Sequence, residues 1–193
     1  MIQDTKKDLI DVAYESFYTN GFHPSGLNSI LDKSNVTKGA LYHYFRSKKA
    51  LMSSIIDEKL NKEFLNFWNE HLTEDQKPSK KIFTLMKRYI QYNPHAVEHG
   101  CFLSNMIVEL SNDESFNIQL QSINNTFIDI IKSALDVAVL RGDLKSGTPT
   151  TTVAKMIVIH FHGMMLQLKN DHSIENYSDN IKTLKLYLQS HRN

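Results

Sequence analysis

The fold is decided by residues 34–51, which read SNVTKGALYHYFRSKKAL. Thr37 is a good N-cap, because its hydroxyl oxygen can accept a hydrogen bond from a free N–H group of the first helical turn. A short helix is therefore predicted from Thr37 to about Phe45. Ser47 offers a second N-cap of the same kind, and the apolar residues that follow it at helical spacing predict a longer helix to about His71.

Another short helix is predicted from Leu27 to Lys33, just before the polar turn Ser34–Val36. Two short helices joined by a tight turn suggest a helix-turn-helix, in which the second helix enters the DNA major groove and the first braces it across the backbone. We expect Asn35 to adopt a positive φ in the turn, which Asn tolerates better than most residues. We expect Ser25 to cap the first of the two helices.

Basic residues are concentrated in the same region. Residues 33–49 contain five Lys or Arg residues and no acid, whereas the whole chain has a net charge of only +1. A local basic patch on a nearly neutral protein suggests one nucleic-acid-binding face. Gly39 and Ala40 keep the start of the second short helix thin, so that its N-terminus can approach phosphates closely. The residues expected to contact DNA are Asn28, Ser29, Thr37, Lys38, Gly39, Tyr42, His43, Tyr44 and Lys48.

Apolar residues recur at helical spacing along almost all of the remaining chain, which predicts an all-α protein of about nine helices. The 193 residues include only 7 Gly and 4 Pro, too few for the many turns of an all-β fold. A single Cys excludes an intrachain disulfide. No apolar run approaches the 18 residues of a membrane span, and the first residues lack the apolar stretch of a signal peptide. A cytoplasmic protein without a membrane partner is therefore expected.

Three segments carry a family resemblance: NGFH at 20–23, LNSI at 27–30 and VTKGALYHYFRSKKAL at 36–51. In this order and spacing they closely resemble the DNA-binding signature of the TetR family of transcriptional regulators. Asn35 departs from the family pattern, where Gly is common, and Pro24-Ser25-Gly26 replaces the usual Thr cap. GCFLSN at 100–105 and the segment ending in RGDL at 141–144 resemble the family more weakly.

The resemblance implies a helix-turn-helix domain at residues 1–48 and an effector-binding and dimerisation domain at residues 49–193. It implies a homodimer that binds a pseudo-palindromic DNA operator as a repressor and is released by a small molecule. It also implies a ligand cavity in the C-terminal domain. The residues expected to line this cavity are Phe64, Met86, Phe102, Met106, Phe127 and Phe161. Because few acids interrupt these apolar stripes, a small apolar or weakly polar effector is expected.

The last two predicted helices carry apolar stripes that we expect to form a two-fold, four-helix seam between subunits. These stripes are Val153, Ile157, Phe161, Met164 and Leu168, followed by Ile174, Tyr177, Ile181, Leu184 and Leu188. Gly163 lies inside the first of the two helices, where it either permits close approach at the seam or has no special role.

A competing hypothesis is a metal-dependent hydrolase, because His95, Glu98 and His99 match the zinc-binding pattern H-x-x-E-H. Pro94 and Gly100 bracket these residues, which favours a polar loop instead. No nucleophile–base pair, phosphate-binding loop or metal-ligand set supports catalysis, so no enzyme activity, metal or cofactor is expected. A third hypothesis is a dimeric adaptor without DNA binding.

Two further features have two interpretations each. His160 and His162 lie two residues apart on a predicted helix, so their side chains point about 200° apart and cannot bind one ion from this segment alone. One is expected to point inward, where it could line a pocket. Cys101 is either a core residue or a sensor of oxidants or electrophiles, activated by the helix N-terminus that follows it.

Overall fold

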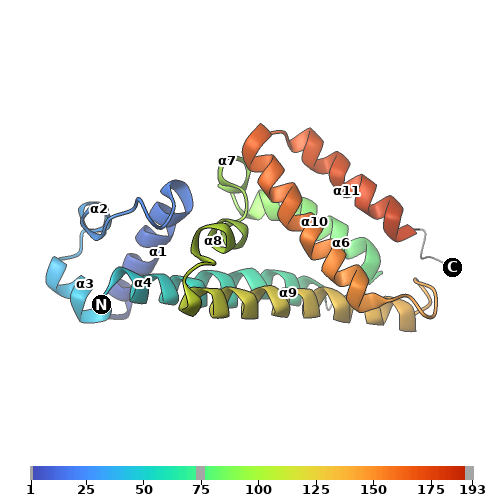
Figure 1. Cartoon of the computed structure of the whole chain (residues 1–193), viewed down its shortest axis with the longest axis horizontal. Coiled ribbons are helices and arrows are strands. Elements are labelled where there is room, and N and C mark those ends of the chain that lie inside the picture. The colour runs from blue at the N-terminus through green and yellow to red at the C-terminus, as the bar shows by residue number, and fades with distance from the viewer. Residues whose placement is uncertain (1, 73–76, 190–193) are drawn as a thin grey trace.

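The computed structural model describes residues 2–72 and 77–189, and within them it is all-α (Figure 1). The helices are α1 (Ile2–Asn20), α2 (Leu27–Lys33), α3 (Lys38–Tyr44), α4 (Lys48–Ile55), the π-helical stretch η1 (Ile56–Phe64), α5 (Leu65–Leu72), α6 (Pro78–Tyr92), α7 (Ala96–His99), α8 (Phe102–Leu110), α9 (Glu114–Leu140), α10 (Thr150–Asp171) and α11 (Ile174–Gln189). With α4, η1 and α5 counted as one continuous rod and the single turn α7 set aside, these residues form the nine helices predicted.

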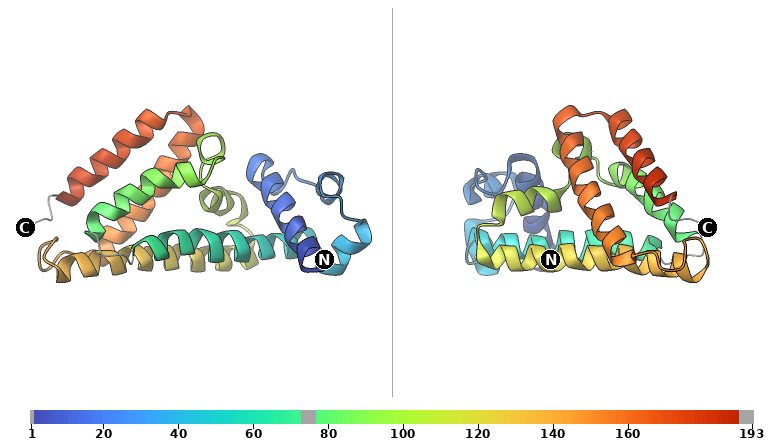
Figure 2. Two further views of the ribbon diagram at one scale, coloured as in Figure 1. Left: turned by 180° about the vertical axis from the view of Figure 1, so that it is seen from behind. Right: turned by 45° about the vertical axis from the view of Figure 1, so that its right-hand side comes forward.

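The α4–η1–α5 rod and α9 form the base of the molecule (Figures 1 and 2). They run in the same direction, because Lys49 at the start of α4 contacts Asp113 before α9, and Phe64 at the end of η1 contacts Phe127 farther along. Helices α1 to α3 occupy one end of this base, and α6, α10 and α11 cover the other end. The short helices α7 and α8 lie between the two groups. None of the described helices is both long and apolar enough to cross a membrane.

Helices α3 and α4 begin at the two side-chain caps that the sequence predicted. Thr37 Oγ1 accepts a hydrogen bond from the Ala40 N–H (3.2 Å), and Ser47 Oγ accepts one from the Ala50 N–H (3.1 Å). Each cap satisfies one N–H group that has no partner within the helix. The two predicted caps are confirmed, and they fix where α3 and α4 begin.

Three local predictions were wrong. Among the described non-glycine residues only His172 has a positive φ, so Asn35 turns the chain without the left-handed conformation. Ser25 does not cap α2, because its hydroxyl lies 2.7 Å from the Gly21 carbonyl oxygen and holds the preceding turn instead. The segment predicted as a loop before Gly100 contains the single helical turn α7.

The predicted dimer seam was also wrong, because its stripes form the core of the single chain. Phe161 is fully buried and Leu184 is 3% exposed, and of the ten seam residues only Ile174 is exposed. The sequence could not tell one buried face from another, since α10 is buried against α9 as well as α11. The large apolar residues exposed on α10 are Ile159 and Leu166, which lie on its opposite face.

An aromatic cluster fills the centre of this core. Trp68 of α5 lies with its ring centre 4.8 Å from that of Phe127 in α9 and 5.3 Å from that of Phe161 in α10. Phe64 and Tyr89 complete the cluster, and most of the rings meet edge to face. Such pairs add to the energy of apolar burial and fix one packing of the four helices.

Candidate DNA interface and interdomain groove

Helix α3 and the basic residues around it form an exposed face at the end of the molecule opposite α11. Thr37, Lys38 and His43 are exposed, and Tyr42 is 46% exposed although it is a large aromatic residue. Leu41 and Phe45 are buried on the other side of the same segment, so packing leaves the basic side facing solvent. An exposed tyrosine beside cations at a helix N-terminus matches the requirements for phosphate binding.

The first turn of α3 is also unusually thin. A Cβ atom built on Gly39 would have only the Thr37 hydroxyl within 4 Å, so no packing inside the chain requires glycine there. The absence of a side chain at Gly39 would allow a DNA backbone to approach the N-terminus of α3 closely. Asn28 and Ser29 of α2 are exposed as well. The predicted DNA contacts remain predictions, but the structure leaves these residues available.

Two of the predicted DNA contacts, Lys48 and Tyr44, are partly engaged within the chain. Lys48 donates a hydrogen bond to the His23 carbonyl oxygen (3.1 Å), and its ammonium lies 4.4 Å from the centre of the Phe22 ring. Burial lowers the pKa of Lys48, while the charge of Glu109 acts in the opposite direction. Tyr44 is half-buried against the domain core, so only its outer edge is left for DNA.

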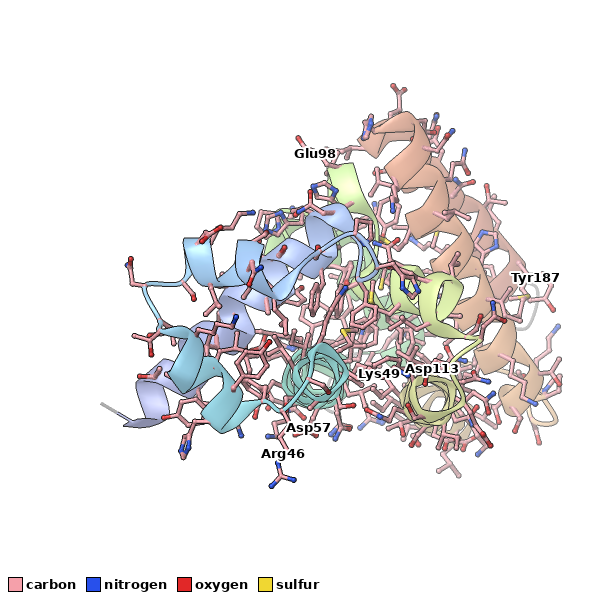
Figure 3. All side chains as sticks on the ribbon, turned by 60° about the vertical axis from the view of Figure 1, so that its left-hand side comes forward. Arg46, Lys49, Asp57, Glu98, Asp113 and Tyr187 are labelled. Carbon is pink, nitrogen blue, oxygen red and sulfur yellow. The ribbon has the colours of Figure 1, made fainter. Side chains whose placement is uncertain are left out.

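Lys49 connects the DNA-binding end to the rest of the molecule (Figure 3). Its Nζ lies 2.5 Å from Oδ2 of Asp113, the N-cap residue of α9. The hydrogen bond from Lys49, together with one from Ser115, lowers the pKa of Asp113 to about 2. This ion pair therefore joins the start of α4 to the start of α9 at neutral pH.

A second connection is made by Glu109, near the C-terminal end of α8. Its carboxylate accepts hydrogen bonds from the backbone N–H groups of Phe22 (2.9 Å) and His23 (2.6 Å) in the turn after α1. Gly21 in this turn has φ +89°, and a Cβ atom on it would lie 3.3 Å from a Glu109 oxygen. Nothing in the sequence linked Glu109 to this turn, because the contact spans more than 80 residues.

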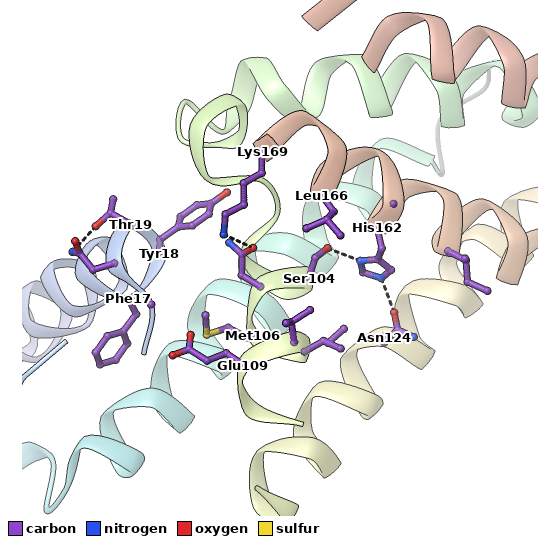
Figure 4. Close-up of a pocket in the computed structure, with 17 residues that line it drawn as sticks. Phe17, Tyr18, Thr19, Ser104, Met106, Glu109, Asn124, His162, Leu166 and Lys169 are labelled. Atoms are coloured by element: carbon purple, nitrogen blue, oxygen red, sulfur yellow. Dashed lines mark hydrogen bonds between the residues drawn. The ribbon is translucent and has the colours of Figure 1, made fainter. Parts of the chain in front are cut away.

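Beside Glu109, a groove with a cavity volume of about 610 Å³ separates α1, α8 and α10 (Figure 4). Three exposed aliphatic residues, Val108, Ile159 and Leu166, line it together with buried Met106. Its polar lining residues include Ser104, Asn105, Asn124, His162 and Lys169. The groove therefore reaches from α10, in the C-terminal half of the chain, to the end of α1.

A polar triad lies in one wall of this groove. His162 Nδ1 lies 2.7 Å from Ser104 Oγ, and His162 Nε2 lies 2.9 Å from Asn124 Oδ1. Because an amide oxygen can only accept, Nε2 carries the hydrogen and Nδ1 of the neutral ring accepts from the Ser104 hydroxyl. Burial lowers the pKa of His162 to about 4, so the ring is neutral at pH 7.

The structure does not bring the six predicted cavity residues around one cavity. Met106 lines the groove, while Phe64 and Phe102 line a smaller cavity of about 270 Å³ near α1 and α6. Met86, Phe127 and Phe161 are fully buried in the core. Helical spacing predicts which residues are buried, but it cannot say which buried faces leave space between them. The predicted ligand contacts remain untested.

The H-x-x-E-H segment is used in other interactions. His95 pairs with Glu15 of α1 at 2.8 Å, and His99 lies 3.7 Å from Glu98. Among the side chains that the structure describes, no group of three or more His, Cys, Asp or Glu residues could hold a metal ion. The hydrolase hypothesis therefore has no structural support.

Cys101 is 1% exposed, and its sulfur lies 3.5 Å from the hydroxyl of buried Tyr89. A thiol enclosed in this way has no direct access to a reagent in solvent. Its surroundings favour the core interpretation over the sensor interpretation.

Comparisons with known proteins agree with the geometry. The profile of the bacterial regulatory proteins of the tetR family matches residues 9–55, which cover most of α1 and all of α2 to α4. An uncharacterized HTH-type transcriptional regulator in the lacX 3′ region of Lactococcus lactis subsp. lactis is 28% identical, over 95% of this chain and 93% of that protein.

Solved structures share the fold along the whole chain. The regulatory protein TetR from Rhodobacter sphaeroides superposes with a TM-score of 0.86 at 20% identity, over 94% of this chain and 97% of that one. The regulator FadR from Bacillus subtilis, solved in complex with stearoyl-CoA, superposes with a TM-score of 0.76 at 19% identity, over 97% and 99%. The matched signature, the exposed helix-turn-helix and this shared fold lead to one conclusion: residues 9–55 carry the DNA-binding signature of the tetR family of bacterial regulatory proteins, and the chain as a whole has the fold of solved TetR regulators.

Proposed function

We propose that the chain is a cytoplasmic repressor that binds a pseudo-palindromic operator as a homodimer and leaves it when a small molecule binds. The observation that carries the proposal is the exposed N-terminus of α3, where Lys38 and Gly39 face solvent with no role inside the chain. In each half-site α3 lies in the major groove, and α2 contacts the backbone through Asn28 and Ser29.

The dimer forms through the outer face of α10 and α11. Ile159 of α10 is 70% exposed, and Gly163 one turn later has nothing within 4 Å of a built Cβ atom. The Asn180 amide donates to Gln167 Oε1 (3.1 Å), which holds the two helices together along this face. Exposed apolar residues on two long neighbouring helices suit a two-fold, four-helix contact between subunits.

The effector acts from the half of the molecule at residues 49–193, which we propose as the second domain. FadR, which shares this fold, was solved with stearoyl-CoA, so the architecture can admit a ligand that carries a long apolar chain. In the present chain the aromatic cluster also leaves the buried Trp68 Nε1–H without a hydrogen-bond acceptor in the described part of the structure. The six cavity residues expected from the sequence are all apolar, so the effector that we propose is apolar or weakly polar.

Selection of bound duplexes from a random DNA pool by the full-length protein tests the proposal. We expect an inverted repeat in which each half-site is protected from cleavage by one subunit. A Gly39→Leu variant should lose the protection, because the added side chain would stand between α3 and the phosphates. Failure to enrich any duplex at low salt would contradict the proposed function.

A further inference from the structure

We infer that Glu109 of α8 and Asp113 at the start of α9 are positioning residues that hold the helix-turn-helix at one angle to the rest of the chain, and that this angle sets how many base pairs can separate the two half-sites of the operator. The inference rests on the proposed function, because it concerns the operator of a homodimer. Neither residue is assigned a DNA contact, so both act on DNA only through the position of α3.

The rod at the base of the molecule has a place where it can bend. α4 is only eight residues long, about 12 Å, before the backbone changes to the π-helical stretch η1 at Ile56. Sharp kinks in helices occur at π-helical turns. A bend of about 15° at η1 would move Lys48, at the far end of α4, by about 3 Å, which is roughly the rise of one base pair. Small bends would therefore change the distance between the two recognition helices of a dimer.

Helices α1 to α4 would move together in such a bend. α1 packs on α2, α3 and α4, and Phe17, Ile30 and Leu41 are fully buried among these helices. Toward its C-terminal end α1 also contacts the rest of the chain around Tyr18, whose hydroxyl donates a hydrogen bond to the Gly100 carbonyl oxygen (2.6 Å). Contacts gathered around one point resist translation more than rotation, so this point can act as a pivot.

Glu109 holds the turn beyond the end of α1. Its carboxylate accepts from the N–H groups of Phe22 (2.9 Å) and His23 (2.6 Å). The His23 carbonyl oxygen accepts from Lys48 of α4 (3.1 Å), so the backbone of His23 is held from α8 on one side and from α4 on the other. The Phe22 ring packs edge to face on Phe116 of α9, with ring centres 5.6 Å apart. A charged acceptor on two backbone donors makes this a strong and well-defined attachment.

Asp113 provides a separate attachment at the start of α4 (Figure 3). Its Oδ2 lies 2.5 Å from Lys49 Nζ, while its Oδ1 accepts from the Ser115 N–H (3.2 Å) and the Ser115 hydroxyl (2.7 Å). One oxygen therefore fixes the carboxylate on α9, and the other oxygen reaches α4. A bend at η1 would pull Lys49 away from this fixed point.

The three attachments together determine the orientation of the helix-turn-helix. Two points of contact leave rotation about the line that joins them, and a third point off that line removes it. Loss of Glu109 and Asp113 would leave the contacts around Tyr18 and the bendable rod. A role in stability alone would lower the free energy of unfolding without changing which operator spacing is preferred, so the spacing preference is the informative measurement.

The test uses the full-length dimer and the duplex that it selects from random DNA, with one base pair added or removed between the half-sites. Each change shifts one half-site by about 3.4 Å and rotates it by about 35° relative to the other. The wild type should bind both altered duplexes at least tenfold more weakly than the selected one. In the double variant Glu109→Gln, Asp113→Asn this difference should fall below threefold. Asn is also a good N-cap, so α9 keeps its start.

The matched control is the double variant Glu98→Gln, Glu114→Gln, which removes two negative charges from exposed carboxylates outside both attachments. It should keep the spacing preference of the wild type. Equal spacing preferences of the two double variants would overturn the inference. If the first double variant does not fold, Lys49→Gln takes its place, because it breaks the same ion pair and leaves the cap of α9 intact. Lys49→Gln should reduce the tenfold difference at least twofold, and an unchanged difference would overturn the inference.

A second measurement needs no DNA. Asp32 of α2 is exposed, so Asp32→Cys can carry a spin label, whereas Cys101 is only 1% exposed and stays unlabelled. Double electron–electron resonance then gives the distances between the two α2 helices in the free dimer. The width of this distance distribution should at least double in the Glu109→Gln, Asp113→Asn variant and stay unchanged in the control, and equal widths would overturn the inference. Because this result does not depend on any duplex being selected, failure of the proposed function remains distinguishable from failure of the inference.

Discussion

Glu109 holds the backbone of His23, a residue 86 positions earlier, through a 2.6 Å hydrogen bond from the His23 N–H. The same carboxylate also accepts from Phe22, so one side chain of α8 fixes the turn between α1 and α2. The end of the molecule that contains α1 to α3 is thus attached to α8 by a charged acceptor on backbone donors, which is stronger than a neutral hydrogen bond.

Glu109→Ala should therefore lower the free energy of unfolding by about 1–3 kcal/mol, because two N–H groups lose a charged acceptor. Urea denaturation measures this loss. Glu98→Ala is the control, since Glu98 is 77% exposed in its side chain and lies 3.7 Å from its partner. Its effect should stay below about 0.5 kcal/mol. If the two substitutions lowered the free energy of unfolding equally, the hydrogen bonds of Glu109 would not contribute more to stability than an exposed ion pair does.

Substitution by a charged residue distinguishes the proposed dimer face from the core of the single chain. Ile159→Glu should give soluble, folded monomers, because the carboxylate would face its own copy across the two-fold axis. Phe161→Glu should fail to fold, because Phe161 is fully buried within one chain. Analytical ultracentrifugation with helical content as the folding check distinguishes the two. Leu140→Glu, at an exposed position on another helix, should remain a dimer, and a stable Ile159→Glu dimer would place the seam elsewhere.

Stability should depend on pH through His162. Its pKa is about 4 in the folded chain against 6.5 when unfolded, so the unfolded state binds a proton first as the pH falls. The free energy of unfolding is then full above pH 6.5 and decreases by about 3 kcal/mol between pH 6.5 and 4. His162→Gln should flatten this part of the profile, whereas His43→Gln, at an exposed position, should not. An unchanged slope in His162→Gln would exclude His162 as its source.

Two glycines with positive φ provide a matched pair. A Cβ atom on Gly100 would lie 2.9 Å from the Met165 carbonyl oxygen, whereas one on Gly142 would have nothing within 4 Å. Gly142→Ala should lower the free energy of unfolding by about 1 kcal/mol from backbone strain alone. Gly100→Ala should lower it clearly more, because α7 and α10 must also move apart. Thermal denaturation measures both variants, and equal decreases in melting temperature would contradict a structural role for the close contact with Met165.

The sequence predicted correctly the features that depend on residues close together in the chain. Thr37 and Ser47 were identified as caps because each cap oxygen and the N–H group that donates to it lie three residues apart. The turn at Asn35 was mistaken because a negative φ also closes it, and sequence alone does not select between the two geometries. The dimer stripe failed because burial inside one chain and burial between two chains give the same periodicity. Glu109 and the groove escaped notice because both are made by segments far apart in the chain.

The central claim, that α3 binds operator DNA through its basic N-terminal face, is tested most directly by the salt dependence of duplex affinity. If each subunit neutralises about two phosphates, the logarithm of the binding constant should fall with the logarithm of salt concentration at a slope of about −4. Lys38→Ala should reduce that slope by about 2 per dimer, while substitution of the exposed Lys185 of α11 by Ala should leave it unchanged. An affinity that does not depend on salt, or an equal loss from both lysines, would contradict the account.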